Sequence, residues 1–358
     1  MKALALVVLA ALCAPWVTAS ARAEGGTSPL AEAGDRKFEY HDTAMGTVIS
    51  VWVWTDDEAR AAKGAHAVFD EMKRLDGVMT TWVRPDTAPS EVVQINQASG
   101  VRPVVVSDET FAVIARAVDV SKRSGGVFDI TVGAFYGLWK FDEDMDGTLP
   151  EPAEVTKRLA LIGWKDIVLD PKKHSVFLRR KGMAITLGGI AKGYAVDKCV
   201  KILVEQGFVD FMVQAGGDMY VSGKKGKDPW GVAIRDPRGP RDSQFAVAPI
   251  TDHSFSTSGD YERGFVKDGV RYHHILDPRT GFPAHASRSV TIRAKDAFTA
   301  DAWSKVMFIY GWKAGLDIIK REKLDDFEVV WVDDQNTLHM TDGIKSVLHV
   351  VKQPTPGP

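Results

Sequence analysis

One glycine-rich segment of the chain could hold a phosphate group. It is Gly188–Gly189–Ile190–Ala191–Lys192–Gly193, and a predicted helix begins within it. Glycines let a backbone approach a ligand closely, a helix N-terminus offers unpaired N–H donors, and Lys192 adds a positive charge. The spacing is neither that of a P-loop nor that of a dinucleotide-binding fingerprint. These residues alone therefore fit a phosphate site and a tight strand-to-helix turn with a solvated lysine equally well.

Two adjacent histidines could supply a general base. His273 and His274 stand directly before Ile275, Leu276 and Asp277. They do not share a helix face, as the two histidines of an HExxH zinc site do. An imidazole titrates near neutral pH, so either ring could accept a proton in a reaction. Either ring could also belong to a turn residue whose hydrogen bonds are satisfied within the protein.

Two further patterns have ordinary structural explanations. Asp301 and Lys305 are four residues apart on a predicted helix, where their side chains are neighbours and can form an ion pair worth roughly a few tenths of a kcal/mol. Residues 142–147 place carboxylates at alternate positions before a glycine, as the front of a calcium loop does. The twelfth position of such a loop is Ala153, whose side chain cannot ligate. This segment therefore predicts an acidic surface turn.

The elements that must position these residues follow from hydrophobic spacing. Apolar residues recur at intervals of four and three over Glu58–Leu75, as in an amphipathic helix. Ser107 as N-cap and Gly125 as stop signal predict a second helix. The remaining predicted helices are Ile190–Gln206, Thr299–Tyr310 and Leu316–Arg321, and the predicted strands are Thr47–Trp54, Phe208–Val213, Ser289–Arg293 and Glu328–Val332. This irregular interleaving favours an α+β fold, with mixed or antiparallel sheets flanked by helices, over a doubly wound sheet.

Composition places the chain among ordinary globular proteins. Of its 358 residues, 45% are hydrophobic and 26% are charged. We expect a single intertwined unit over residues 37–350, preceded by a flexible leader at 24–36 and followed by a disordered tail at 351–358. The net charge of −2 gives no electrostatic reason to expect a nucleic acid or an anionic membrane as a partner.

The N-terminus has the pattern of an export signal. Lys2 precedes an apolar run that ends at Leu12, and small residues follow up to Ala23. This predicts a signal peptide at residues 1–23 and a periplasmic protein. The apolar run is shorter than the ~20 residues of a spanning helix, so no stable membrane anchor is expected. Leu12 before Cys13 argues against a lipoprotein, and Cys199 is then the only cysteine left, which excludes an internal disulfide.

Eight blocks of residues occur in one order over most of the chain. They are Met45–Gly46–Thr47, Thr80–Thr81–Trp82 with Ser90–Glu91 and Asn96, Gly126 to Gly133 with Leu138–Trp139, Gly188 to Asp197, Gly216–Gly217–Asp218, Thr257 to Tyr261, His274 to Gly281 with Pro283, and Ala300–Asp301–Ala302. From about Phe38 to about Lys345 the chain thereby resembles the ApbE-like family of FAD:protein FMN transferases. The resemblance implies an enzyme that attaches FMN from FAD through a phosphoester bond to a Thr or Ser of another protein and releases AMP.

The resemblance also implies which residues form the site. FAD contacts fall on Met45, Trp82, Val127, Phe128, Asp129, Thr186, Lys192 and Ile275. Trp82 suits stacking on a flat ring, and Lys192 with the glycine turn suits the pyrophosphate. The magnesium ion of the family falls on the Gly189 carbonyl and the side chains of Asp301 and Lys305. The candidate catalytic residues are His274, which would assist the acceptor hydroxyl, and Asp301.

Two positions depart from the family pattern. Thr186 stands where the family usually has Asp, and Lys305 stands where it has a Thr metal ligand. A lysine ammonium has no lone pair to donate to a metal. The helical spacing of Lys305 and Asp301 suggests that the lysine replaces part of the metal charge, either by contacting the pyrophosphate or by pairing with Asp301.

Three functions are compatible with these residues. The first, and our prediction, is a transferase that acts on exported flavoproteins, expected to be extracytoplasmic parts of membrane electron-transfer complexes. The second is a protein that binds or stores FAD without cleaving it, which the replacements at Thr186 and Lys305 favour. The third is an FAD pyrophosphatase that uses water as the acceptor and releases FMN and AMP.

Overall fold

The computed structural model describes residues 34–83, 85, 87–141 and 144–357. The predicted signal peptide and most of the predicted leader lie outside the described residues, as do the first two residues of the acidic segment at 142–147. Residues 35–358 form one compact unit. Among the described residues, no helix has both the length and the apolar character needed to cross a membrane.

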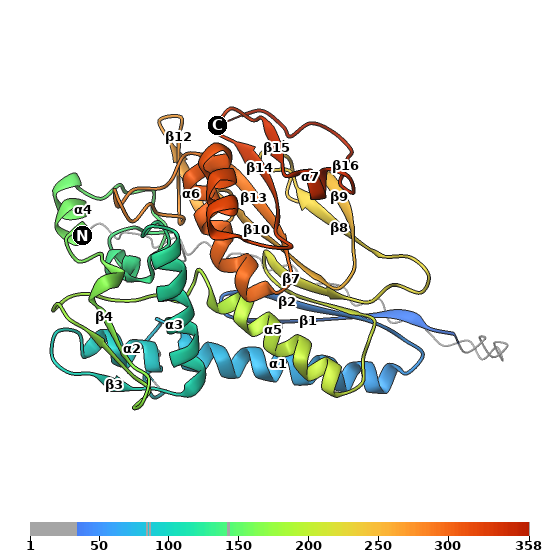
Figure 1. Ribbon diagram of the computed structural model, residues 1–358, viewed down its shortest axis with the longest axis horizontal. Helices are drawn as coiled ribbons and strands as arrows, with labels where there is room; N and C mark the ends of the chain where they lie inside the picture. The colour runs from blue at the N-terminus through green and yellow to red at the C-terminus, as the bar shows by residue number, and fades with distance from the viewer. Residues whose placement is uncertain (1–33, 84, 86, 142–143, 358) are drawn as a thin grey trace, which may run out of the picture. The chain divides into compact units, whose positions relative to one another are not determined.

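An eight-stranded sheet forms the centre of this unit (Figure 1). Its order is β1-β2-β6-β7-β10-β13-β14-β15, and every neighbouring pair is antiparallel. The strands are β1 Arg36–Ala44, β2 Thr47–Thr55, β6 Phe211–Ala215, β7 Asp218–Ser222, β10 His253–Gly259, β13 Ser287–Ala294, β14 Glu328–Asp333 and β15 Leu338–Met340. The predicted α+β class with antiparallel sheets is therefore confirmed.

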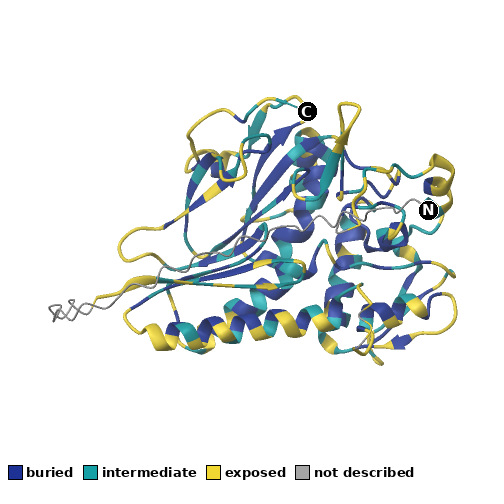
Figure 2. Cartoon of the chain, turned by 180° about the vertical axis from the view of Figure 1, so that it is seen from behind, coloured by how far each residue is buried: buried dark blue, intermediate teal, exposed yellow. Residues whose placement is uncertain are grey.

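Three helices cover one face of the sheet: α1 Glu58–Met79, α5 Ala191–Glu205 and α6 Ala297–Glu322. Their buried residues and the inward-facing residues of the strands form the main hydrophobic core. Figure 2 shows α1 with a buried side and an exposed side, as its hydrophobic spacing predicts. In β2, Val51 and Val53 point into this core, while Trp52 and Trp54 alternate to the other face.

That other face carries a second, smaller core. It is closed by a three-stranded sheet of β8 Trp230–Arg235, β9 Gln244–Ile250 and β16 His349–Val350, and by the short helix α7 Asp342–Lys345. Phe245 and Ile250 of β9 are fully buried there. The central sheet is thus covered on both faces, which fixes its register because a slip by one residue would exchange the two faces.

The remaining elements form a helical and loop-rich part beside α6 (Figure 1). Its helices are α2 Glu91–Gln97, α3 Asp108–Arg123 and α4 Pro152–Leu159, with the 3-10 turns η1 Ile130–Phe135 and η2 Trp164–Asp166. Its strands are β3 Val104–Val105, β4 Ile167–Asp170 and β5 Ser175–Leu178, and a separate hairpin consists of β11 Gly264–Lys267 and β12 Val270–His273. This part supplies the loops that face the glycine segment.

Most of the predicted helices are confirmed, and their caps agree. The Ser107 side chain accepts a hydrogen bond from the Thr110 amide at the start of α3. The two helices predicted on either side of residue 311 run as one segment with a break at Gly311, where φ is 71°. The predicted strand at 208–213 is shifted: Phe208 still belongs to the turn that caps α5, because its amide bonds to the Leu203 carbonyl, and β6 begins only at Phe211.

The prediction of a disordered tail is wrong for residues 351–355. The Val351 amide bonds to the Phe245 carbonyl, and the Pro354 carbonyl accepts a hydrogen bond from Asn336. Thr355 donates to the Asp236 carboxylate through both its amide and its hydroxyl, and Lys352 pairs with the same carboxylate at 2.8 Å. A fully buried acid thus anchors a segment whose composition alone suggests fraying.

Candidate functional site

The site lies where the first turn of α5 crosses the first turns of α6. Gly193 makes this crossing possible, because a Cβ there would lie 2.2 Å from the Ala297 carbonyl oxygen and 2.7 Å from Asp301 Cβ. The Gly193 amide donates a 2.9 Å hydrogen bond to Asp301 Oδ2. The N-terminus of one helix therefore faces a fully buried carboxylate of the other.

A second buried acid fixes the start of α6. The Asp197 carboxylate of α5 accepts hydrogen bonds from the amides of Ala297 and Phe298, at 2.8 and 2.9 Å. Asp296 caps the same helix through the Thr299 amide. Burial raises the pKa of Asp197 to about 7, against the two backbone hydrogen bonds, which act in the opposite direction. Asp197 therefore positions the helix that carries Asp301.

Two ammonium groups and two carboxylates meet at this crossing. Lys192 Nζ lies 2.9 Å from Asp218 Oδ2, and Lys305 Nζ pairs with Asp301 Oδ1 one helical turn away. Both carboxylates are almost completely buried, whereas the lysine side chains keep 22% and 16% of their surface exposed. The two carboxylates are thus inaccessible to solvent, and the two lysine side chains form the solvent-facing side of the cluster.

The charges of the cluster favour the ionised forms of Lys192 and Asp301. Burial by itself would lower the pKa of Lys192, but Asp218 and Asp301 outweigh it and raise that pKa. Burial would raise the pKa of Asp301, but Lys192 and Lys305 outweigh it and lower that pKa. Burial and the neighbouring Asp301 raise the pKa of Asp218 above its usual range. Asp301 is therefore the acid that stays firmly ionised, and Lys192 keeps its positive charge.

The glycine turn lies directly beside this cluster. A Cβ on Gly189 would lie 3.8 Å from Lys305 Cε and 3.4 Å from the Phe128 ring. The structure therefore brings together Gly189, Asp301 and Lys305, the three positions predicted for a metal. It also places Phe128 and Lys192, two predicted FAD contacts, at the same turn and the helix that follows it.

The donor atoms do not form a complete magnesium shell. Asp301 Oδ1 faces the Lys305 ammonium, and its Oδ2 accepts the Gly193 amide. Asp218 Oδ1 is buried and has no hydrogen-bond partner within the described part of the chain. No cluster of three or more His, Cys, Asp or Glu side chains that could hold a metal occurs in the described ranges. A positive charge already occupies the position where the family would place a third ligand.

The structure separates the roles of the two histidines. His273 is buried; its Nε2 lies 2.8 Å from the Ala284 carbonyl, and its Nδ1 faces the Ile275 amide at 3.3 Å. Both ring nitrogens are thus satisfied by the backbone. His274 is exposed, and its Nδ1 lies 3.3 Å from the Arg263 carbonyl oxygen. A carbonyl can only accept, so Nδ1 carries the proton and Nε2 keeps a free lone pair.

The surroundings keep the His274 ring neutral. Partial removal of this exposed ring from water is the main cause that lowers its pKa, and the nearby charges of His273, Arg263 and Lys305 act in the same direction. His274 thus has an unprotonated Nε2 at neutral pH, and Lys305 lies close enough to act on its pKa. A neutral ring can accept a proton, and its lowered pKa makes it a weak base.

Arg263 links the histidine to the first hairpin, and sequence reasoning missed it. Its guanidinium donates to the Gly46 carbonyl at 3.1 Å, while its own carbonyl accepts from His274. Met45 and Gly46 form the two-residue turn between β1 and β2, with φ of 52° and 68°. Arg263 thereby connects the turn that contains the predicted FAD contact Met45 to the loop of the predicted base. The feature of the sequence that could have identified Arg263 is its position just after the block that ends at Tyr261.

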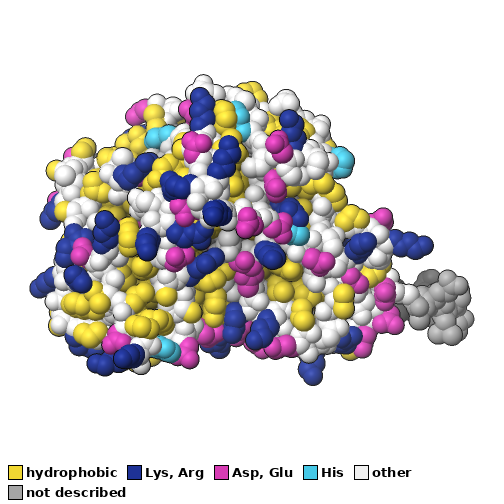
Figure 3. All heavy atoms as spheres, viewed as in Figure 1, with side chains coloured by type: hydrophobic (Ala, Val, Ile, Leu, Met, Phe, Trp, Pro, Cys, Tyr) yellow, Lys and Arg dark blue, Asp and Glu magenta, His cyan; other side chains and the backbone are white. Residues whose placement is uncertain are grey.

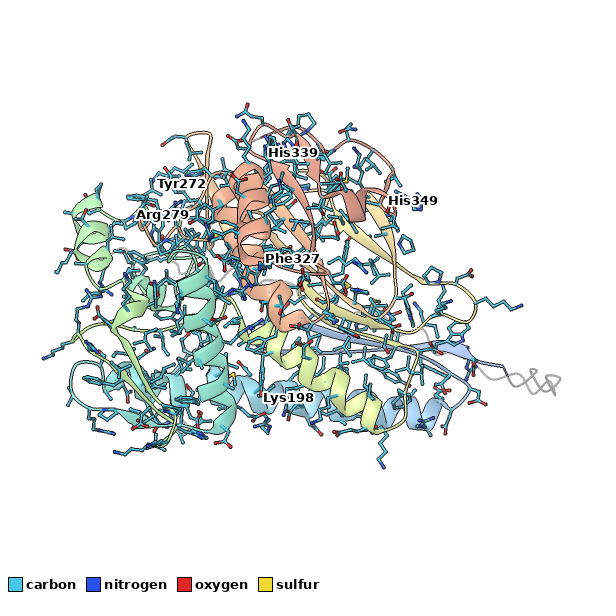
Figure 4. The ribbon with its side chains drawn as sticks, in the orientation of Figure 1. Lys198, Tyr272, Arg279, Phe327, His339 and His349 are labelled. Atoms are coloured by element: carbon cyan, nitrogen blue, oxygen red, sulfur yellow. The ribbon has the colours of Figure 1, made fainter. Side chains whose placement is uncertain are left out.

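The hairpin that positions His274 was also missed. It consists of β11 and β12, and Asp268–Gly269 forms its turn with two positive φ angles. An Asp-Gly pair between apolar strands is a strong hairpin signal, so it was visible in the sequence. Tyr272 of this hairpin stacks on Phe265, and Arg279 in the following loop lies over the Tyr310 ring of α6 at 5.4 Å. Figure 4 labels Tyr272 and Arg279.

The other predicted FAD contacts differ in how accessible they are. Trp82 is 46% exposed and meets the exposed Tyr136 edge to face, with ring centres 5.6 Å apart. Val127, Phe128 and Ile275 are buried, so only their backbones or ring edges can face a ligand. An exposed aromatic pair thus remains available for a flat ring.

The polar groups of Asp129 and Thr186 form hydrogen bonds within the protein. Asp129 Oδ1 accepts from the amide and hydroxyl of Thr131, and its Oδ2 accepts from the Trp164 amide. Burial raises the pKa of Asp129 in spite of these bonds. The Thr186 amide donates to the Ile130 carbonyl, and its hydroxyl accepts from the Gly188 amide at 3.3 Å. Both residues therefore shape the loops at the glycine turn.

The face of the molecule shown in Figure 3 has no single dominant charge. On the face in Figure 3, basic and acidic side chains are interspersed with apolar ones. Cys199 is buried in α5, where burial raises the pKa of its thiol. Neither feature adds a second reactive group to the cluster.

Two known proteins are similar to this chain over most of its length. The FAD:protein FMN transferase of Klebsiella pneumoniae is 31% identical over 83% of this chain and 90% of its own length. That of Treponema pallidum is 32% identical over 80% of this chain and 82% of its own. Both relatives thus align with nearly the whole of the described unit.

Solved structures give the same result. The crystal structure of the ApbE protein of Thermotoga maritima matches with a TM-score of 0.78 and 33% identity, over 87% of this chain and 99% of that one. The flavin transferase ApbE of Vibrio cholerae matches with a TM-score of 0.76 and 26% identity over the same shares. The family model described as the ApbE family matches residues 45–331. This chain therefore belongs to the ApbE family.

Proposed function

We propose that this protein transfers FMN from FAD to a Thr or Ser hydroxyl of another protein and releases AMP. The observation that carries the proposal is the meeting of Lys192 and Lys305 at the glycine turn and the start of α5. The neutral ring of His274 lies close enough to Lys305 for that charge to act on its pKa. These are the parts that phosphoryl transfer needs: a way to activate the hydroxyl and fixed positive charge for the phosphates.

The pyrophosphate of FAD binds at the glycine turn and the start of α5. An ammonium has three N–H donors. One donor of Lys192 faces Asp218, so the other two can bond to phosphate oxygens. Gly188 and Gly189 leave the backbone open to close approach by a ligand. The flavin ring stacks on Trp82, whose side chain is exposed.

The acceptor hydroxyl loses its proton to His274 Nε2 and attacks the FMN phosphorus. A new P–O bond forms to the acceptor oxygen, and the bond between that phosphorus and the bridging oxygen breaks. The bridging oxygen and its electron pair leave with AMP. The proton passes from His274 to solvent, so the products are the FMN phosphoester, AMP and one proton. The neutral state of His274 fits it for this step at neutral pH.

The acceptor and the compartment follow from the sequence. The export signal predicted at residues 1–23 supports a periplasmic protein whose acceptor is an exported flavoprotein. We expect that acceptor to be an extracytoplasmic part of a membrane electron-transfer complex. In the family a magnesium ion would neutralise phosphate charge. The residues of this chain do not fit that ion, since Lys305 faces Asp301 Oδ1, and no step here depends on it.

Mass spectrometry tests the proposal. The purified protein is incubated with FAD and a Thr-containing acceptor peptide, with Mg²⁺ in one sample and EDTA in another. A peptide heavier by FMN, together with AMP, is the expected result in at least one sample. Free FMN and AMP without a modified peptide would instead show a pyrophosphatase, and intact bound FAD would show a storage protein.

A matched pair of variants assigns the base. His274→Gln should abolish the modified peptide while FAD binding persists. His349→Gln is the control, because His349 is exposed on β16 and lies well away from Arg279 (Figure 4). Equal loss in both variants would contradict the role of His274.

A further inference from the structure

Lys305 occupies the position from which a metal ion would act. It stands one turn after Asp301 on α6, pairs with Asp301 Oδ1, and passes its Cε close to Gly189. The carboxylate it faces is completely buried, whereas its own side chain is 16% exposed. The ammonium therefore sits between the buried acid and the open side of the glycine turn.

The pair leaves too few oxygen ligands for a divalent cation. Magnesium binds near-octahedrally to oxygen atoms, and every ligand must offer a lone pair. Asp301 offers neither oxygen freely, since one accepts the Gly193 amide and the other the Lys305 ammonium. A cation at this point would also be repelled by Lys192 and Lys305. The ammonium and a divalent cation therefore compete for the same carboxylate oxygen.

We propose that the Lys305 ammonium is the built-in cation of this site, and that FAD binding and FMN transfer need no divalent metal. The inference rests on the proposed function. One donor of the ammonium is used on Asp301, and two remain for phosphate oxygens. Paired with Asp301, the group is held in place, as a bound metal would be. Its charge offsets the negative charge that develops on the departing AMP oxygen when the P–O bond breaks.

The test compares FAD affinity and Mg²⁺ binding in the wild type and in Lys305→Thr. The threonine removes the ammonium, frees Asp301 Oδ1 and adds a hydroxyl oxygen. Fluorescence quenching should show equal FAD affinity of the wild type in EDTA and in Mg²⁺. In EDTA the variant should bind FAD about 10- to 100-fold more weakly, with Mg²⁺ restoring the affinity. Calorimetry should show Mg²⁺ binding to the variant and none to the wild type.

Two further variants separate charge from folding. Lys305→Arg keeps a positive charge and should keep binding FAD in EDTA. Lys201→Thr is the matched control, because Lys201 forms an exposed i,i+4 pair with Glu205 on α5. It should behave as the wild type. Circular dichroism of each variant reports whether a loss comes from unfolding, in which case Lys305→Arg alone decides the test.

The outcomes distinguish this inference from the proposed function. If the wild type binds FAD and modifies the peptide only with Mg²⁺, or binds Mg²⁺ itself, the inference is overturned and the transferase remains. The inference is also overturned if calorimetry shows the same Mg²⁺ binding for the wild type and for Lys305→Thr. If the wild type binds no FAD in either buffer, the proposed function fails along with it.

Discussion

The backbone amide of Gly193 and the carboxylate of Asp301 are joined by a 2.9 Å hydrogen bond across the crossing of α5 and α6. This contact requires the two backbones to approach so closely that no side chain fits between them. It sets the distance between Lys192, which follows the glycine turn, and Lys305, which follows Asp301 on α6. The phosphate site is thus a property of how two helices pack.

Gly193→Ala should therefore disrupt both the fold and the site. The new methyl would lie 2.2 Å from the Ala297 carbonyl oxygen, which belongs to backbone and cannot rotate away. We expect a loss of about 1–3 kcal/mol in the free energy of unfolding and weaker FAD binding. Urea denaturation and fluorescence quenching measure the two effects. Gly77→Ala in α1 is the control: with open space around it, it should match or exceed wild-type stability by up to about 1 kcal/mol.

His274→Gln should reduce the rate of FMN transfer by about 10²- to 10⁴-fold with little change in FAD affinity. The lowered pKa of His274 predicts the pH dependence as well. The ring is the active base only when neutral, and it protonates below its ordinary value of 6.5. The wild-type kcat/KM should therefore stay flat as the pH falls from 8 to 6.5 and decline only at lower pH. A midpoint at or above 6.5 would contradict a base in this environment.

Local patterns in the sequence predicted much of the fold. The amphipathic spacing predicted α1 with its start at Glu58, and the N-cap residue Ser107 predicted the start of α3. Both patterns depend on residues that are at most four positions apart. The hairpin with Asp268–Gly269 was equally local and was overlooked. The shifted β6 shows the limit of such patterns, since an apolar Phe208 can serve a helix cap as well as a strand. The anchored tail depends on Asp236, which is distant in sequence.

The candidate site divides in the same way. The pair of Asp301 and Lys305 was predictable, because residues four apart on a helix are neighbours. The pair of Lys192 and Asp218 was not, since it joins α5 to β7 and depends on how the helix lies on the sheet. The same is true of Arg263, which connects the histidine loop to the turn at Gly46. Composition and spacing give residue types, whereas these contacts arise only from tertiary packing.

Trp82→Ala should weaken FAD binding by about one order of magnitude, since the exposed ring would lose its stacking on the flavin. Trp82→Phe keeps an aromatic face and should retain most of the affinity. Val83→Ala is the matched control, because Val83 is a neighbouring residue that is 70% exposed. Fluorescence quenching of FAD measures all three. Equal affinities of Trp82→Ala and the wild type would place the flavin elsewhere.

Asp197 should make stability depend on pH in an unusual direction. Its pKa in the folded protein is raised to about 7, from the ordinary value of 3.8 for an aspartate side chain. Between these values the folded state binds more protons than the unfolded state, so the contribution of Asp197 to stability falls as the pH rises through this window. Most acids in ion pairs have lowered pKa values and act in the opposite sense. The cause here is burial of the carboxylate beside Asp296 and Asp301.

Asp197→Asn tests this directly, because its side chain cannot titrate. The amides of Ala297 and Phe298 bond to different carboxylate oxygens, so the single amide oxygen of the variant keeps only one of these two hydrogen bonds at any pH. Urea denaturation at pH 5 and pH 8 gives the free energy of unfolding of each protein. The wild type should lose more stability than the variant between the two pH values, so the difference between the two proteins should narrow from pH 5 to pH 8. If the variant instead falls behind most at pH 8, the ionised carboxylate stabilises the start of α6, and its charge-assisted bonds to the helix N-terminus outweigh the cost of burial.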